Sequence, residues 1–190
     1  MGGAGMQAGV MSTLQYKAID PERLDAMRDQ GADEFGNPWK ARVAEGWEPL
    51  RCCLRTAVAG EDIALISYSP WPVPWDTPWG EAGPVFVCFR RCAGYQTPGE
   101  YPPDLRGRFS LLNPFDHTGA RAYRHITFVE PGDDYPAAVE QVMAQPDVAY
   151  LHVRSAVAQC FTFEVRPADG PRQEGSAARL ARPSPGPPPR

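Results

Sequence analysis

The chain has 190 residues and a formal net charge of −4. This length predicts one domain with a hydrophobic core large enough to fold without covalent or metal cross-links. The acidic balance argues against a nucleic-acid partner, which usually meets a basic patch, and against a polybasic membrane-surface protein. No run of apolar residues approaches the roughly 18 that a membrane span needs, so no membrane partner is expected.

Two terminal segments are predicted to lie outside the domain. Residues 1–11 have neither the basic nor the apolar region of a signal peptide and are expected to form a flexible extension. Residues 168–190 are rich in Pro, Gly, Ser and Arg. Such a segment buries too little apolar surface to offset its chain entropy, so this tail is expected to be disordered. The domain is then residues 12–167.

The five cysteines indicate a reducing compartment. Their number is odd, Cys52 and Cys53 are adjacent, and no export signal precedes them. Disulfide frameworks in small secreted proteins usually use an even number of cysteines after such a signal. We therefore expect reduced thiols and a cytoplasmic location.

The N-terminal half of the domain is predicted to contain one helix and several short strands. Asp20 and Pro21 form a helix start, and Gly31 ends that helix. The segment 70–83 is expected to be a loop, because its prolines exclude a helix or a central strand. Strands are expected over residues 14–18, 50–56, 62–69 and 85–90, with a hairpin turn at 57–60 joining the middle two.

The C-terminal half is predicted to contain a second helix, which Asp133 or Asp134 caps and Pro146 ends. Because short turns link most neighbouring strands, antiparallel pairing is expected. The fold class is therefore α+β: a single domain with a mainly antiparallel sheet of about seven short strands and two helices packed on one face. The C-terminal strands span residues 109–112, 122–129, 148–154 and 159–166. The core is expected to contain Ile126, Phe128, Ala137, Val139, Val142, Leu151, Phe161 and Phe163.

A long segment carries the motifs of a known family. Its most specific parts are the Gly-Pro-Val-Phe-Val run at 83–87 and the segment Val148–Val153 followed by Cys160-Phe161. Further matching positions are Pro49-Leu50-Arg51, Leu54, Gly60-Glu61, Ile66-Ser67-Tyr68, Arg108, Asp116 and Gly119. With these motifs, residues 49–166 resemble the bacterial family called domain of unknown function 1203. The resemblance implies this fold and a bacterial origin, and it implies no activity.

The chain departs from that family pattern at three places. The pattern has a cysteine where this chain has Leu50 and an arginine where it has Asn113, and the residues around Arg124-His125 are also unlike the family. If the usual cysteine and arginine are functional in the family, this member has a changed activity.

Alternation along the strands gathers polar side chains on one face of the predicted sheet. That face would carry Tyr123, His125, Tyr150, His152, Arg154, Cys160 and Glu164. Histidine exchanges protons near neutral pH, and arginine can hold a carboxylate through two hydrogen bonds. We therefore predict His125, His152 and Cys160 as catalytic residues, and Tyr68, Tyr123 and Arg154 as substrate-binding residues. The solvated face of an ordinary antiparallel sheet has the same pattern, and this simpler interpretation stays open.

Three tryptophans, Trp71, Trp75 and Trp79, lie on the proline-rich loop. Each indole can bury roughly 150–250 Å². In one interpretation the indoles seal the edge of the core. In the other they form an apolar lid over the polar face and bind substrate, making a pocket for an aromatic or polyketide-like molecule. The second interpretation predicts that the loop lies across the polar face.

Several short motifs give no support to a site. Asp116-His117 lacks the Gly-x-Ser-x-Gly elbow that would support a Ser-His-Asp triad. Cys88 and Cys92 are spaced one residue wider than Cys-x-x-Cys and no second pair follows, so no metal site is predicted. The sequence has no phosphate loop, dinucleotide fingerprint or heme motif, so no cofactor is expected.

Three functions remain open from the sequence. The first is a cofactor-independent acid–base enzyme acting on a small organic molecule, an isomerase, cyclase or lyase of specialised metabolism, in which His125 and His152 exchange protons. The second is a non-catalytic small-molecule-binding protein, and the third a protein-interaction module that uses the tryptophan loop or the Pro-rich tail. A closed pocket with a histidine at its base would favour the first, and an apolar pocket with both histidines outside would favour the second. The absence of a pocket would favour the third. The sequence does not set the substrate or the oligomeric state.

Overall fold

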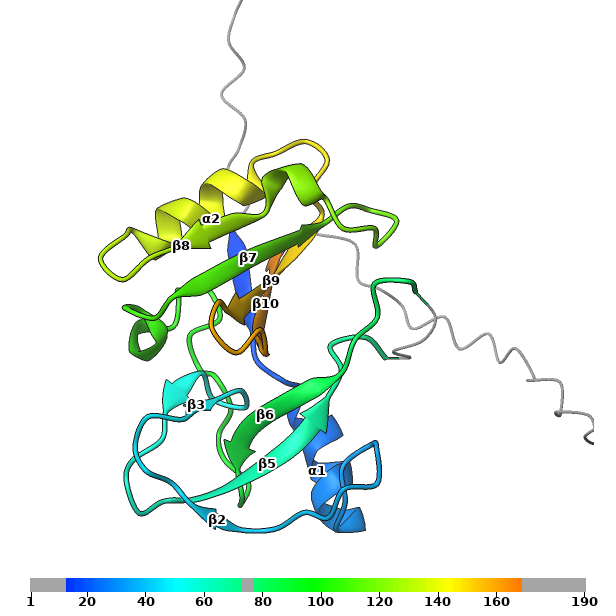
Figure 1. The fold of residues 1–190 in the computed structure, drawn as a ribbon, viewed down its shortest axis with the longest axis vertical. Helices are drawn as coiled ribbons and strands as arrows, with labels where there is room; N and C mark the ends of the chain where they lie inside the picture. Colours follow the sequence, from blue (N-terminus) through cyan, green and yellow to red (C-terminus); the bar gives the residue numbers. More distant parts are fainter. Residues whose placement is uncertain (1–12, 73–76, 169–190) are drawn as a thin grey trace, which may run out of the picture.

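The computed structural model describes residues 13–72 and 77–168. These residues form a single α+β domain with two α-helices, two short 3-10 helices and ten strands in two sheets. In Figure 1 the two sheets lie one above the other. The predicted α+β class is confirmed, but the single predicted sheet of about seven strands is replaced by two sheets of five.

The upper sheet, named the β9 sheet, has the strand order β1-β10-β9-β7-β8, and all its neighbouring pairs are antiparallel. Its register places Leu112, Val153 and Phe163 in one row across three strands, and Asn113, His152 and Glu164 in the next row on the opposite face. The strands are β1 (Leu14–Lys17), β7 (Ser110–Phe115), β8 (Thr127–Val129), β9 (Tyr150–Ser155) and β10 (Phe161–Pro167).

The lower sheet, named the β5 sheet, has the order β2-β5-β6-β3-β4. Its strands are β2 (Arg42–Val43), β3 (Pro49–Leu50), β4 (Arg55–Thr56), β5 (Asp62–Tyr68) and β6 (Gly83–Cys88). β3 runs parallel to β6, and the other pairs are antiparallel. The strand predicted over residues 50–56 is instead the tight hairpin β3–β4. Strands of two residues are too short to show the alternation by which a strand is predicted.

Both helices start at their predicted caps, and α1 ends at the predicted Gly31, while α2 ends three residues before Pro146. Helix α1 (Pro21–Gln30) begins after Asp20, whose carboxylate accepts a hydrogen bond from the Glu22 amide at 2.9 Å, and ends at Gly31 with φ 71°. Helix α2 (Tyr135–Met143) begins after Asp134, which accepts from the Ala137 amide at 3.1 Å. These local hydrogen bonds satisfy amides that the first turn leaves without partners.

The helices cover different sheets, and the prediction of both on one face is wrong. Leu24 and Met27 of α1 belong to the hydrophobic core that contains the buried residues of the β5 sheet. Val139 and Val142 of α2 belong to a second core with those of the β9 sheet. Each sheet therefore buries one face under its own helix. A 3-10 helix, η1 (Pro103–Leu105), lies in the connection from β6 to β7.

The predicted strand over residues 122–129 is wrong in its first half, where a 3-10 helix, η2 (Tyr123–His125), precedes β8. Val129 is buried, whereas Phe128 is 50% exposed. Because β8 pairs Val129 with Ser110 and Phe128 with Leu111, the side predicted as core faces outward. Of the remaining predicted core residues, Ile126 is half-buried and Ala137 is exposed, while five are buried: Val139, Val142, Leu151, Phe161 and Phe163.

A bulge in β10 changes which face Phe161 occupies. Phe161 pairs with Arg154 and Phe163 with the next residue, Val153, so one extra residue is inserted into β10. Phe161 therefore packs against His152, with 5.3 Å between ring centroids, and does not share a face with Phe163 as strict alternation predicted.

Neither α-helix in the described part of the chain is long and apolar enough to cross a membrane.

Candidate functional site

A large cavity of about 440 Å³ lies where the two sheets meet. One wall comes from the β5 sheet and the loop before β3, and the other from the β9 sheet with η1. Most of its lining is apolar, including Trp47, Leu65, Phe86, Leu105, Phe109 and Val157. The cavity therefore has the size and walls of a site for a small organic molecule.

Arg51 brings a positive charge into this apolar cavity. Arg51 directly follows β3, and its backbone amide donates to the Phe86 carbonyl at 2.9 Å. The residue is only 4% exposed, and its Nε donates to the carbonyl of Phe161 at 2.9 Å. Burial lowers the pKa of Arg51 to about 10. Within the described ranges, no carboxylate lies within ion-pair distance of this guanidinium.

Further polar groups line the same cavity. Nη2 of Arg108 donates to the Trp47 carbonyl at 3.0 Å and to the Thr56 hydroxyl at 2.9 Å. The hydroxyl of Tyr101 is buried and has no hydrogen-bond partner in the described part of the chain. Burial raises the pKa of Tyr101, so this phenol stays neutral. An unpartnered buried hydroxyl is costly to a folded protein.

His152, a predicted catalytic residue, lies deep in the polar face of the β9 sheet. It is 1% exposed, and the rings of Trp71, Phe115, Tyr150 and Phe161 surround it at centroid distances of 4.8 to 5.5 Å. Its Nε2 lies 3.5 Å from a Glu164 oxygen, and its Nδ1 has no partner among the described residues. Burial lowers the pKa of His152, which favours the neutral imidazole.

Glu164 stays ionised beside His152. Burial alone would raise the pKa of Glu164, but hydrogen bonds from His152 and Arg166 outweigh it and lower the pKa to about 2. The Arg166 guanidinium pairs with both carboxylate oxygens, at 2.5 and 3.0 Å. The carboxylate of Glu164 is therefore satisfied by His152 and Arg166, whereas Nδ1 of His152 and Oδ1 of Asn113 on the same face have no partner among the described residues.

A smaller cavity of about 200 Å³ brings together three of the predicted residues: Tyr68, Arg154 and Cys160. Arg154 already has partners within the protein, because its guanidinium pairs with Glu81 and its Nε donates to the Gln159 carbonyl at 2.8 Å. Cys160 borders this cavity and the large one.

His125 and Tyr123 lie in η2, away from the strand face where the sequence placed them. Nε2 of His125 lies 2.8 Å from Asp147, and Tyr123 is exposed. The two histidines thus have separate carboxylate partners, Asp147 and Glu164.

The described part of the tryptophan loop, residues 70–72 and 77–83, brings Trp71 against the polar face of the β9 sheet. Trp71 packs on His152 at 5.0 Å between ring centroids, and Nε1 of Trp79 donates to the Tyr123 hydroxyl at 3.2 Å. Trp71 fills the space over the histidine, and His152 lines neither the large cavity nor the smaller one. Trp75, predicted with them, lies outside the described residues.

The fold assembles a cluster of four thiols that the sequence-based prediction missed. Cys52, Cys53, Cys88 and Cys92 place all four sulfur atoms within 4.8 Å of one another. The sequence predicts no metal site, because Cys88 and Cys92 are one residue too widely spaced for Cys-x-x-Cys and no second pair follows them. The β3–β4 turn supplies that pair from earlier in the chain. The adjacent cysteines Cys52 and Cys53 were a signal of this cluster in the sequence. Only the pairing of β3 with β6 shows that they lie beside Cys88.

Comparison with known proteins finds one family. The family model described as "Protein of unknown function (DUF1203)" matches residues 47–166, which include the β3–β4 turn, both cavities and every strand from β3 to β9. No curated protein matches the chain, and no solved structure does. Because the match covers well over half of the sequence, the chain belongs to the DUF1203 family.

Proposed function

We propose that this protein binds a small organic molecule with an apolar body and an anionic group in the cavity between the two sheets. The observation that carries the proposal is the buried Arg51 guanidinium, which faces an apolar cavity without a carboxylate partner in the described residues. The guanidinium donates to the carbonyl oxygens of Phe161 and Pro49, but a buried charge without a counter-ion still costs several kcal/mol. An anionic ligand would recover much of that cost.

The size and chemistry of the lining support the same class of ligand. About 440 Å³ lies within the range of roughly 300–1,000 Å³ typical of small-molecule sites. Apolar walls would hold the body of the ligand, while Arg51 and Arg108 would attract its charge.

Binding without catalysis is the better supported of the small-molecule proposals. Neither His125 nor His152 lines the large cavity, whereas Cys160 does. An acid–base reaction therefore has one predicted catalytic residue at this cavity and no paired base beside it. We also infer that the protein is located in the bacterial cytoplasm, because that reducing compartment would keep its thiols reduced.

The probe that tests the proposal is 8-anilinonaphthalene-1-sulfonate, an aromatic anion whose fluorescence rises in apolar sites. We expect the folded protein to bind one molecule per chain. The variant Leu65→Glu adds a carboxylate to the cavity wall and should weaken binding roughly tenfold or more, because like charges a few ångströms apart repel by about 1 kcal/mol or more even in water.

The matched control is Val43→Glu. Val43 is also an exposed aliphatic residue of the β5 sheet, at 70%, but it does not line the cavity. The control should bind the probe as the wild type does. Equal weakening by both substitutions, or no saturable binding to the wild type, would refute the proposal.

A further inference from the structure

We propose that Cys52, Cys53, Cys88 and Cys92 bind a single Zn²⁺ ion as four thiolate ligands in a tetrahedral site. The four sulfur atoms lie within 4.8 Å of one another. Zn–S bonds of about 2.3 Å at tetrahedral angles separate the sulfurs by about 3.8 Å. The Cys52–Cys53 and Cys53–Cys88 sulfur distances are both 3.8 Å, the spacing that one central ion requires.

The strand register explains why cysteines 36 residues apart meet. β3 and β6 run parallel with Leu50 opposite Phe86, so Cys52 and Cys88, each two residues further along, come side by side. The Cys88 amide donates to the Cys52 sulfur at 3.2 Å. Cys53 follows in the β3–β4 turn, where Leu54 has φ 53°, and Cys92 follows Cys88 by four residues. The spacing of Cys88 and Cys92 falls within the two to four intervening residues usual for zinc ligands.

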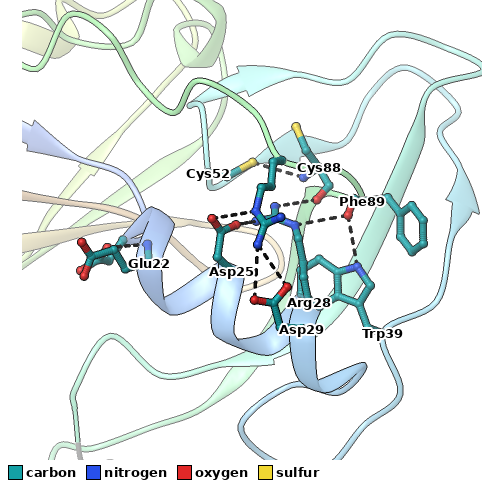
Figure 2. A network of polar contacts seen from close by, with 10 residues as sticks. Glu22, Asp25, Arg28, Asp29, Trp39, Cys52, Cys88 and Phe89 are labelled. Atoms are coloured by element: carbon teal, nitrogen blue, oxygen red, sulfur yellow. Dashed lines mark hydrogen bonds and ion pairs between the residues drawn. The ribbon is translucent and has the colours of Figure 1, made fainter.

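The loop that carries Cys88 and Cys92 is fixed from outside the cluster. Figure 2 shows Arg28 of α1 donating to the carbonyl oxygens of Cys88, at 3.0 Å, and Phe89, at 3.3 Å. Nε1 of Trp39 also donates to the Phe89 carbonyl, at 3.2 Å. Arg91 reaches back to α1 through Asp25 at 2.9 Å and Asp29 at 3.1 Å. Outer contacts of this kind hold ligand-bearing backbone in place before an ion binds.

Positive charge next to the sulfurs suits four thiolates. Nη2 of Arg55 lies 3.8 Å from the Cys88 sulfur, while the same guanidinium also pairs with Glu61. A zinc ion with four thiolates has two excess negative charges, and N–H groups that point at the sulfurs stabilise such a site. Cys52 and Cys88 are buried, which keeps water from the ion, while the exposed Cys92 leaves the metal a path from solvent.

Neither disulfide bonding nor ordinary core packing explains this geometry as well as a bound ion does. The sulfur distances of 3.8 Å are far from the bond length of about 2.0 Å in a disulfide. Ordinary core cysteines need no mutual contact, and thiols are weak hydrogen-bond donors to one another. Four sulfur ligands with no place for water indicate a structural rather than a catalytic ion, and tetrahedral sulfur sites take zinc or iron.

The test uses the full chain purified without chelator and under reducing conditions. Elemental analysis should find one zinc per chain. Replacing zinc by Co²⁺ should give the visible bands of a tetrahedral cobalt site and a sulfur-to-cobalt charge-transfer band. A strong zinc chelator should lower the melting temperature, because binding to the folded state stabilises it.

Two serine variants localise the site. Cys92→Ser alters an exposed loop residue, so the domain should still fold, and it should weaken zinc binding by more than the roughly 10- to 100-fold that loss of an outer contact costs. Cys160→Ser removes the one thiol outside the cluster and should keep one zinc. The proposal is overturned if the wild type binds no zinc or binds iron instead, if Cys160→Ser loses zinc as Cys92→Ser does, or if the cysteines of freshly purified protein are joined as disulfides.

Discussion

At the scale of single residues, the most unusual group is the neutral imidazole of His152 under Trp71. Four aromatic rings and the ionised Glu164 surround it, and burial lowers its pKa from the ordinary value of 6.5. The folded protein therefore resists protonation of this ring, while the unfolded chain accepts a proton below about pH 6.5. Above that pH the ring is neutral in both states, and below it the proton favours unfolding.

We predict that the free energy of unfolding falls as the pH drops from about 7 to 5, and that His152→Gln makes this slope shallower. Chemical denaturation at a series of pH values measures this dependence of the free energy of unfolding on pH. Glu164 does not interfere, because its lowered pKa changes stability only as the pH falls below about 4.5. The control His117→Gln replaces an exposed histidine and should leave the slope unchanged; an unchanged slope for His152→Gln as well would contradict the buried neutral ring.

At the scale of elements, helix α1 supports both the core of the β5 sheet and the loop that follows β6. Its apolar residues enter the core of that sheet, and its Arg28 fixes the backbone at Cys88 and Phe89. The helix stops where Gly31 adopts φ 71°, and the Gly31 amide donates to the Arg28 carbonyl at 3.1 Å. A side chain in that backbone region costs roughly 1 kcal/mol.

Gly31→Ala should therefore lower the free energy of unfolding by about 1 kcal/mol. A methyl group at this position would meet no atom within 4 Å, so backbone strain is the whole effect. Gly99→Ala is the matched control, because Gly99 has equally open surroundings and no positive φ. It should be neutral or stabilise by up to about 1 kcal/mol. Urea denaturation measures both, and equal effects would show that the φ of Gly31 is not the constraint.

The elements also show how far the sequence predicts this molecule. Both helices are predictable with their caps, since Asp20, Gly31 and Asp134 act through contacts a few residues away. The strands of two residues are not, because they carry no periodic pattern. The bulge at Phe161 and the outward Phe128 depend on register with strands far along the chain. The thiol cluster and the cavity depend on the same long-range pairing, so no local motif reveals them.

At the scale of the whole molecule, the two sheets bury their helix-covered faces separately and leave the large cavity between them. Residues of both sheets line it, so the cavity exists only in the assembled domain. Arg51 follows β3, its amide bonds to β6, and its guanidinium Nε bonds to the Phe161 carbonyl of β10. This one residue thereby links the two sheets and supplies the charge of the proposed site.

The decisive measurement for an anion site at Arg51 compares two probes that differ by one sulfonate group. 8-Anilinonaphthalene-1-sulfonate and N-phenyl-1-naphthylamine share their aromatic body, and only the first is an anion. We predict that the wild type prefers the anion and that Arg51→Gln loses about 10- to 100-fold of that preference, since a hydrogen bond to a charged group contributes roughly 1.5–3 kcal/mol. Arg51→Lys, which keeps the charge, should retain part of it. Equal affinity of the wild type for both probes, or a preference that survives Arg51→Gln, would contradict an anion site at this residue.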